Sequence, residues 1–398
     1  MKRLQKKFAN YNEPQMAMKM GFYPFYHPLE SGQDTEVIYK GKKVLMFGSN
    51  SYLGLTRHPE VVEAAKKALD TYGTGASGSR LMNGNLDLHE KLEKELADYV
   101  QKPAATVFST GFQVNMGVIP SIVGRNDYVI IDDKNHASII EGTRLAFAKT
   151  LKYKHNDMEG LEKILQRIGD KQTNLIVTDG IFSMEGDIAK LDKIVELAEK
   201  YGASIMVDDA HALGVIGEKG AGTASHFGLT DKTDLIMGTF SKSLASLGGF
   251  IAGDPEVINY IKHNSRSLLF SAGIPPASAA TVLKALEIIK REPERIQKLH
   301  DNTEYAKKLL QEAGFSTGHT ESPIIPIFVG DNISTYKYGA ILLEKGIYVN
   351  PVVHPAVEKG KGILRFSLMA THTNEQIEKA IEVLKEVRKI IQAQQNGQ

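Results

Sequence analysis

The stretch G-T-F-S-K-S at residues 238–243 follows an apolar, strand-like segment at 234–237 and precedes the small-residue stretch 244–249. Its lysine, Lys242, therefore lies where an ammonium group loses much of its water. An unpaired buried charge costs several kcal/mol, so a lysine in such a place needs a specific partner. Loss of water also favours the neutral amine, which can form an imine with an aldehyde. The stretch predicts a reactive lysine at the end of a strand.

A second stretch, V-D-D-A-H at residues 207–211, follows another apolar run. Here Asp208 can pair with a pyridinium nitrogen and keep it protonated, and His211 can hydrogen-bond a phenolic oxygen. One alternative is a helix cap with a structural histidine. Another is a metal site of Asp208, Asp209 and His211, although no second cluster of ligands accompanies them. With Lys242, these are the groups that hold and activate pyridoxal 5'-phosphate, the cofactor that we expect.

Hydroxyl groups and a glycine at a helix start are candidates for a phosphate site. Thr239 and Ser241 lie beside the reactive lysine, and S-T-G-F at 109–112 ends a strand and opens a helical pattern. Backbone N–H groups at a helix start bind anions, and glycine allows close approach. We therefore expect Gly111 and Phe112 to bind phosphate, with an ordinary strand-to-helix turn as the alternative.

Two further residues are candidates on weaker grounds. His136 follows a strand at 128–131 and could stack on a pyridine ring, or be an ordinary loop histidine near a helix start. Arg365 alternates with apolar residues on a strand, and its planar fork suits a carboxylate if it faces a cleft rather than solvent.

Short apolar runs alternate with helical patterns through most of the chain. We expect strands at 104–108, 128–131, 175–178, 204–207, 234–237 and 250–252, then at 324–328, 347–349 and 364–367. Most of them lie between helical stretches such as 59–72 and 191–201. This rhythm predicts an α/β fold, a mostly parallel sheet with helices on both faces, and ligands collect at the carboxyl ends of its strands. We expect an N-terminal arm at 1–45, a large cofactor-binding domain at 46–285 and a small C-terminal α/β domain at 286–398.

Composition excludes several classes of protein. The chain has 48 Lys and Arg against 47 Asp and Glu, so its formal charge of +1 gives no electrostatic reason to expect nucleic acid. It has no cysteine, which excludes disulfides and zinc–thiolate sites. Without an apolar run of about 18 residues or a secretory signal, we expect a cytoplasmic protein.

The loop G-T-G-A-S-G at 73–78 matches a dinucleotide-binding fingerprint, which needs a strand before it and a helix after it. A helical pattern precedes this loop, and residues 79–84 have no helical periodicity. We interpret it as a glycine loop and not as a nicotinamide site.

Taken together, these motifs resemble the α-oxoamine synthases, fold-type-I pyridoxal-phosphate enzymes that join an amino acid to an acyl-CoA with loss of carbon dioxide. The resemblance runs from about residue 23 to 387. Its anchors are S-N-S-Y-L-G-L at 49–55, S-T-G-F at 109–112, D-x-x-H-A-S at 133–138, D-G-x-F-S-M-E-G-D at 179–187, D-x-A-H at 208–211 and T-x-S-K at 239–242.

The resemblance implies a homodimer with shared active sites and a role for each matching residue. Lys242 would carry the cofactor as an imine, Asp208 would meet the ring nitrogen, and His136 would stack on the ring. The implied catalytic residues are Lys242, His136, Asp208 and His211. These four would also bind the cofactor, together with Gly111, Phe112, Ser183, Thr239, Ser241 and Ser271. The implied substrate residues are Asn50, Tyr72, His136 and Arg365. Asn50, Tyr72 and Ser271 are the residues that could reach in from the partner subunit.

Within that family the chain most resembles the enzymes that condense L-serine with a long-chain acyl-CoA, through phrases such as G-S-R-x-x-N-G at 78–84 and R-F-S-L-M-A-T-H-T at 365–373. Leu81, Met82 and Asn85 depart from the expected pattern, which leaves acyl-chain length open. The nearest alternatives condense glycine with acetyl-CoA or alanine with a pimeloyl thioester. An aminotransferase and a cofactor-bound regulator are more distant alternatives.

A lipid product would make peripheral contact with the inner membrane a further expectation. The basic, amphipathic arm at residues 1–20 could serve such contact, or it could pack on the partner subunit.

Overall fold

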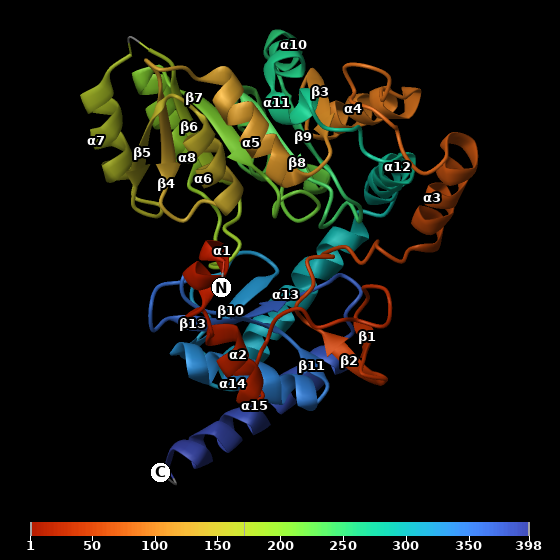
Figure 1. The fold of residues 1–398 in the computed structure, drawn as a ribbon, viewed down its shortest axis with the longest axis vertical. Helices are drawn as coiled ribbons and strands as arrows, with labels where there is room; N and C mark the ends of the chain where they lie inside the picture. The colour runs from red at the N-terminus through yellow and green to blue at the C-terminus, as the bar shows by residue number, and fades with distance from the viewer. Residues whose placement is uncertain (1, 171, 397–398) are drawn as a thin grey trace.

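A seven-stranded sheet forms the upper half of the molecule in Figure 1 and carries the motifs described above. The computed structural model describes residues 2–170 and 172–396. The strand order is β3-β9-β8-β7-β6-β4-β5, and β9 runs antiparallel to both of its neighbours while the other pairs are parallel. The strands are β3 (Ala104–Phe108), β4 (Tyr128–Asp132), β5 (Lys149–Tyr153), β6 (Asn174–Asp179), β7 (Ser204–Asp208), β8 (Leu235–Thr239) and β9 (Gly249–Gly253).

Helices cover both faces of this sheet because its strands are apolar on both sides. Alternate residues of β4 illustrate this: Ile130 belongs to one buried cluster, and Val129 and Ile131 belong to the other. The helices that contribute to the first cluster beside this sheet include α4 (Asp87–Tyr99), α7 (Met158–Ile168), α8 (Leu191–Tyr201) and α12 (Pro276–Arg291). Those of the second are α5 (Gly111–Ile122), α6 (Ala137–Leu145), α10 (Pro255–Asn264) and α11 (Arg266–Leu269). The predicted mostly parallel sheet between two helical layers is confirmed.

The lower half of the molecule in Figure 1 contains two three-stranded sheets and three long helices. One sheet has the order β10-β13-β12 and the other β1-β2-β11, in which β2 pairs in parallel with β11. The strands are β1 (Glu36–Tyr39), β2 (Lys42–Met46), β10 (Ile324–Gly330), β11 (Ile347–Tyr348), β12 (Asn350–Val352) and β13 (Gly362–Ser367). The helices are α13 (Glu294–Glu312), α14 (Asn332–Glu344) and α15 (Asn374–Asn396).

Six further elements complete the described chain. They are α1 (Arg3–Phe8), α2 (Glu13–Lys19), α3 (Pro59–Tyr72), α9 (Thr223–His226) and the 3₁₀ turns η1 (Glu218–Gly220) and η2 (Thr230–Lys232). No helix in the described part of the chain is long and apolar enough to cross a bilayer.

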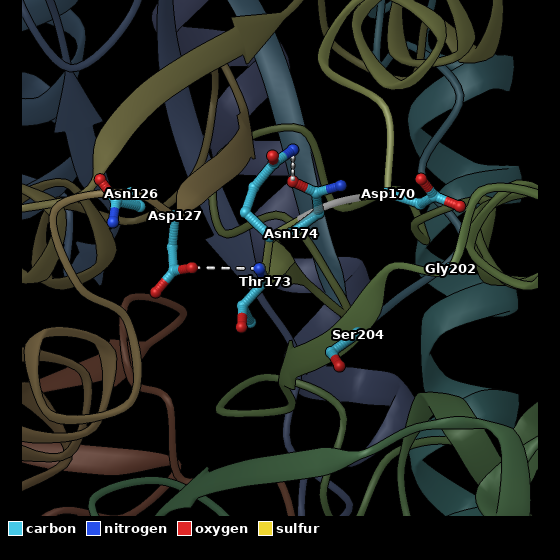
Figure 2. A pocket seen from close by; sticks show the side chains of 8 residues that line it. Asn126, Asp127, Asp170, Thr173, Asn174, Gly202 and Ser204 are labelled. Carbon is cyan, nitrogen blue, oxygen red and sulfur yellow. Dashed lines mark hydrogen bonds between the residues drawn. The ribbon is translucent and has the colours of Figure 1, made fainter.

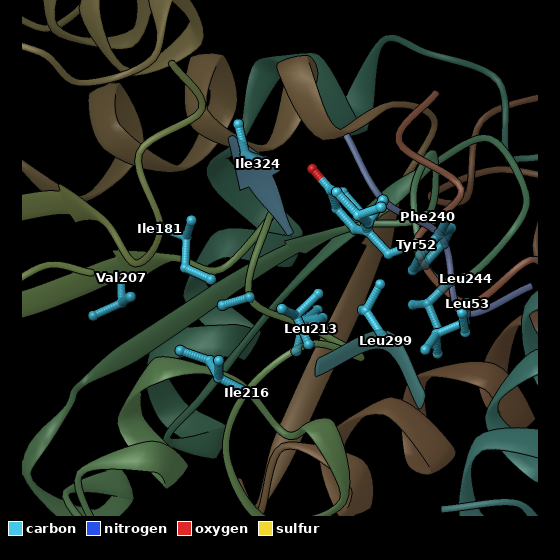
Figure 3. Packing of buried hydrophobic residues seen from close by; sticks show 14 of the residues in the cluster. Tyr52, Leu53, Ile181, Val207, Leu213, Ile216, Phe240, Leu244, Leu299 and Ile324 are labelled. Carbon is cyan, nitrogen blue, oxygen red and sulfur yellow. The ribbon is translucent and has the colours of Figure 1, made fainter. Parts of the chain in front are cut away.

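One hydrophobic core runs through both halves. Figure 3 shows Leu213 and Phe240, from the large-sheet half, in the same buried cluster as Leu299 of α13 and Ile324 of β10. Tyr52 lies in this cluster as well, with none of its surface exposed. The lower half is therefore packed against the carboxyl edge of the sheet through a continuous apolar contact.

The domain limits stay predictions. Helix α12 and strand β2 each span one of the predicted limits. The limit at 285/286 lies inside α12, which packs on α3 and α4. The limit at 45/46 lies inside β2, which joins the sheet of β11. We propose that the large domain continues to Arg291 and that β1 and β2 belong with the C-terminal half.

The sequence did not predict strands β1, β2, β5 and β12, and the local sequence of each explains why. Edge strand β5 carries Lys149 and Lys152 with exposed side chains, and charged residues are typical of sheet edges. Strand β12 has three residues and contains Pro351. The hairpin of β1 and β2 turns at Lys40 and Gly41, both with positive φ, inside the segment interpreted as an arm.

Replacing Phe250 with alanine tests the importance of the core. Phe250 of β9 is fully buried, so Phe250→Ala should lower the free energy of unfolding by about 3–5 kcal/mol, measured by denaturant titration. Phe147 is 72% exposed and its ring lies under the Arg125 guanidinium, so Phe147→Ala should cost less than about 1 kcal/mol. Equal losses in the two variants would contradict this assignment of the core.

Candidate active site

Three neighbouring strands bring their polar ends together at the carboxyl edge of the sheet. Asp179 ends β6, Asp208 ends β7 opposite it in the ladder, and Lys242 follows β8 by three residues. Both aspartates are buried, with 3% and 2% of their surfaces exposed. This is the edge at which parallel sheets bind ligands.

Lys242 experiences charges of both signs. Burial lowers its pKa to about 7, and the nearby Arg365 guanidinium acts in the same direction, while the carboxylates of Asp208 and Asp179 oppose them. An amine with this pKa is partly neutral at physiological pH. It can therefore act as a nucleophile or as a proton acceptor.

Asp208 is held by two hydrogen bonds. Its Oδ2 accepts from the Nδ2 of Asn115 at 2.7 Å, and its Oδ1 accepts from the backbone N–H of Ala210 at 3.0 Å. Burial and the Asp208 charge raise the pKa of Asp179 well above its usual value. The pairing of β6 and β7 thus places two carboxyl groups where the charge of Asp208 disfavours ionisation of Asp179.

His136 forms the N-cap of α6 and is anchored through both its backbone and its ring. Its backbone N–H donates to Asp179 Oδ2 at 2.8 Å, and its Nδ1 lies 2.7 Å from the Ser138 hydroxyl. The ring of Phe112 meets the imidazole edge-to-face, with centroids 6.3 Å apart. The loss of water around its ring lowers the pKa of His136, as does the Lys242 charge, so the imidazole is neutral near pH 7.

His211 is buried beneath the same edge and bonds to Tyr52. The Tyr52 hydroxyl lies 2.7 Å from His211 Nδ1. Burial, followed by the charges of Lys242 and Arg365, lowers the pKa of His211 well below its usual value. The imidazole is therefore neutral and available as a hydrogen-bonding group.

Arg365 enters the site from β13 in the lower half of the molecule. It is 4% exposed and donates from Nε to the Ser183 carbonyl oxygen at 2.7 Å and from Nη1 to Asn50 Oδ1 at 2.9 Å. Further bonds reach the hydroxyls of Ser367 at 2.9 Å and Tyr52 at 3.4 Å. All four acceptors are neutral oxygens, so these bonds leave the positive charge uncompensated.

A cluster of hydroxyls faces the start of α5. Thr239 Oγ1 lies 3.1 Å from Ser241 Oγ, and a Cβ on Gly111 would come within 2.6 Å of Thr239 Oγ1, so only glycine fits this approach. The first N–H groups of a helix have no acceptor within it. Ser271 lies beside the same helix, where its hydroxyl accepts from Gln113 Nε2 at 3.3 Å.

A cavity of about 390 Å³ adjoins Lys242 and Ser241 and extends past Asn50 toward Asn350. A different hollow, of about 510 Å³, lies at the opposite edge of the sheet, before β4, β6 and β7. Figure 2 shows that polar groups line it, including Asp127, whose carboxylate accepts from the Thr173 N–H at 3.0 Å. Lys242 lines the first cavity, and neither it nor the two buried aspartates line the second.

These groups fit pyridoxal 5'-phosphate. The glycine-lined helix start and the hydroxyls of Thr239 and Ser241 suit a phosphate, and the buried carboxylate of Asp208 suits a pyridinium nitrogen. Lys242 supplies an amine for the aldehyde. Fold and site together define a fold-type-I pyridoxal-phosphate enzyme.

Comparisons with known proteins agree with this class. The family described as aminotransferase class I and II matches residues 42–384. A serine palmitoyltransferase from Sphingobacterium spiritivorum is 56% identical over 97% of this chain and 97% of its own. An 8-amino-7-oxononanoate synthase from Alkaliphilus metalliredigens is 43% identical over 92% of this chain and 93% of its own.

Among solved structures, a serine palmitoyltransferase with a pyridoxal-phosphate internal aldimine superposes with a TM-score of 0.95 at 33% identity, covering 98% of this chain and 99% of that one. The enzyme from Sphingomonas wittichii gives 0.94 at 33% identity, covering 97% and 98%. The chain belongs to the class I and II aminotransferase family, and within it to the α-oxoamine synthases. The predicted family and cofactor are confirmed.

The structure brings together most of the residues predicted for the site, and their individual roles stay predictions. Asn50 meets Arg365 of its own chain, and Ser271 meets α5 of its own chain. Tyr72 is apart, since its hydroxyl donates to Asp87 at the start of α4.

Sequence reasoning missed three residues that hold the site, namely Asn115, Ser138 and Tyr52. Asn115 had a detectable signal, because it is an amide on an otherwise apolar helical face one turn after Gly111. Ser138 and Tyr52 lay within quoted motifs but had no assigned role.

A second, partly buried charge network supports the loop that carries Ser183. The ring of His155 bonds Asp132 through Nδ1 at 3.1 Å and Asp187 through Nε2 at 2.9 Å. Burial acts to lower the pKa of His155, but these two hydrogen bonds outweigh it and raise the pKa to about 10. The imidazolium thus ties the end of β4 to the loop after β6.

His155 should therefore make stability depend on pH in the alkaline range. Since its folded pKa of about 10 exceeds its ordinary value of 6.5, its contribution is complete below pH 6.5 and is lost as pH rises through 10. Denaturant titrations of the wild type should show falling stability from pH 7 to 10. His155→Gln should be less stable at pH 7 and lack that part of the slope; an unchanged slope would contradict the charged pair.

Proposed function

We propose that this enzyme condenses L-serine with a long-chain acyl-CoA such as palmitoyl-CoA, giving 3-ketodihydrosphingosine, CoA and carbon dioxide for sphingolipid synthesis. The observation that carries the choice of substrates is the 54–56% identity, over at least 96% of the chain, to three proteins named serine palmitoyltransferase. Proteins named 8-amino-7-oxononanoate synthase are 42–43% identical, which makes their reaction the second candidate.

The cofactor, when bound, supplies an electron sink for a carbanion at the amino acid Cα. Lys242 is our candidate for the amine that holds it and for the base at Cα, because its pKa of about 7 suits proton transfer. Asp208 would keep the ring nitrogen protonated, and His211 would donate to or accept from the phenolic oxygen. Gly111, Phe112, Thr239 and Ser241 would hold the phosphate, Ser183 would lie beside the ring, and Ser271 is a further predicted cofactor residue.

Arg365 is our candidate for the substrate carboxylate. Its guanidinium is buried and bonded to neutral oxygens alone, so a carboxylate would supply its missing counter-charge. Asn50, which accepts a hydrogen bond from Nη1 of Arg365, would help to orient the substrate carboxylate. Tyr72 stays a predicted substrate residue that would act across a subunit contact.

The bond changes balance without an external oxidant or reductant. The serine Cα loses its proton to a protein base and forms a bond to the acyl carbonyl carbon, while the thioester C–S bond breaks and CoA leaves. The Cα–carboxylate bond then breaks to release carbon dioxide, and a proton returns to Cα. His136, lying over the site, would donate to the thioester oxygen.

We also propose a homodimer with shared active sites. Large apolar side chains near the site are exposed in the single chain, and Phe270 and Met82 are 78% and 77% exposed. A second copy of the chain would remove this area from water. Peripheral contact with the inner membrane of a cytoplasmic enzyme also stays a prediction.

An activity grid tests the proposed function. Serine, glycine and alanine are each combined with acetyl-, pimeloyl- and palmitoyl-CoA, and products are identified by mass. We expect the largest kcat/KM for serine with palmitoyl-CoA, and no turnover by Lys242→Ala. A preference for alanine with pimeloyl-CoA would replace our proposal with the second candidate.

Removing the charge of Arg365 should separate binding of the two substrates. Arg365→Gln should raise KM for serine about 10- to 100-fold, since a hydrogen bond to a charged group contributes about 1.5–3 kcal/mol. KM for the acyl-CoA should change little. Arg388→Gln is the control, because Arg388 of α15 donates to the backbone carbonyls of Ala313 and Gly314 and lies over the Phe315 ring. An unchanged serine KM in Arg365→Gln would refute the assignment.

A further inference from the structure

A buried relay of hydrogen bonds connects Asp208 to His136, and its central member is Asn115 of α5. Asn115 Nδ2 lies 2.7 Å from Asp208 Oδ2 and 2.8 Å from Ser138 Oγ. The Ser138 hydroxyl lies 2.7 Å from His136 Nδ1. Asp208, Asn115 and Ser138 are at most 2% exposed, so water does not compete for these bonds.

The chemistry of the two ends fixes the direction of every bond. An ionised carboxylate only accepts, so the Asn115 atom that faces Asp208 is the amide nitrogen and not the oxygen. Its two hydrogens are then used, one on Asp208 and one on Ser138 Oγ. Because Ser138 accepts from Asn115, its own hydroxyl hydrogen is free to point to His136 Nδ1.

Nδ1 of His136 is an acceptor for a second reason. The backbone N–H of Ser138 also points to it, at 3.3 Å. A neutral imidazole has one donor nitrogen and one acceptor nitrogen. With Nδ1 accepting from Ser138 twice, the proton of neutral His136 is on Nε2.

We propose that Asn115 and Ser138 are positioning residues, which orient the Asp208 carboxylate and hold His136 as the Nε2–H tautomer. His136 then presents a donor, and not an acceptor, to the acyl thioester oxygen. That last assignment rests on the proposed function, whereas the tautomer and the orientation of Asp208 do not depend on the identity of the substrates.

The relay leaves one polar atom of Asn115 unsatisfied. Asn115 Oδ1 is buried and has no hydrogen-bond partner in the described part of the chain. A leucine of similar size would remove this unsatisfied oxygen, which offsets part of the cost of withdrawing a donor from Asp208 and from Ser138. Asn115→Leu should therefore still fold while losing both donors. Asn302 of α13 is the matched control: it is buried, its Oδ1 also lacks a partner, and its Nδ2 donates to backbone carbonyls at 2.9 Å and 3.0 Å.

Neutron diffraction from deuterated crystals of the holoenzyme tests the tautomer directly. We expect a deuteron on His136 Nε2, none on Nδ1, and the Ser138 hydroxyl deuteron directed at Nδ1. A deuteron on Nδ1, whether or not Nε2 also carries one, would overturn the assignment.

Two variants separate the ends of the relay. Asn115→Leu should lower kcat about 10- to 100-fold, the usual effect of removing a residue that orients a reactive group through a hydrogen bond. The same variant should weaken binding of pyridoxal phosphate to the apoenzyme. Ser138→Ala should lower kcat but leave cofactor affinity unchanged, because the bond from Asn115 to Asp208 remains. Ser138→Thr keeps the hydroxyl and should restore kcat, and Asn302→Leu should leave both quantities at wild-type values.

Wild-type cofactor affinity in Asn115→Leu would overturn the role at Asp208, and wild-type kcat in Ser138→Ala would overturn the role at His136. A wild-type enzyme that releases no CoA with serine would instead refute the proposed function. The neutron result and the cofactor affinities would still decide the relay.

Discussion

The site depends on one electrostatic constraint, the placement of a lysine amine with little water beside a buried carboxylate. Lys242 follows β8 and Asp208 ends β7, so the parallel ladder itself sets their proximity. Burial alone would make the ammonium costly, and the carboxylate alone would hold it charged. Their opposition gives an amine that titrates at about 7 and can exchange protons under physiological conditions.

Much of the surrounding structure maintains this balance. Arg365 adds positive charge from the lower half of the molecule, and Asp179, with a raised pKa, adds a carboxyl group that need not be ionised. Asn115 and the N–H of Ala210 occupy both oxygens of Asp208. The carboxylate is thus solvated by fixed protein dipoles in place of mobile water, which is how preorganised sites avoid reorganisation during a reaction.

Sequence reasoning succeeded where the signal is local and failed where it is not. Apolar runs next to D-x-A-H and T-x-S-K predicted the strand ends, because period and flanking residues decide a buried parallel strand. Strand β5 was missed because its exposed lysines are typical of a loop, and β2 was missed because it too begins with exposed lysines and lies in the segment interpreted as an arm. The pairing of β2 with β11, about 300 residues away, has no local signal. The bonds from Asn115 to Ser138 and from Tyr52 to His211 join distant segments, and no local pattern encodes such pairs.

The bonds of Arg365 also couple binding to the arrangement of the two halves. The arginine comes from β13, and it donates to Ser183 in the loop after β6, on the large-sheet side. Four of the five N–H groups of this guanidinium already donate, so a carboxylate ligand that takes a bidentate grip must displace at least one of these bonds. Ligand affinity and the geometry of the junction are consequently linked. Thermodynamic coupling is reciprocal: if a looser junction changes ligand affinity by some factor, the bound ligand changes the equilibrium between the tight and loose junction by the same factor.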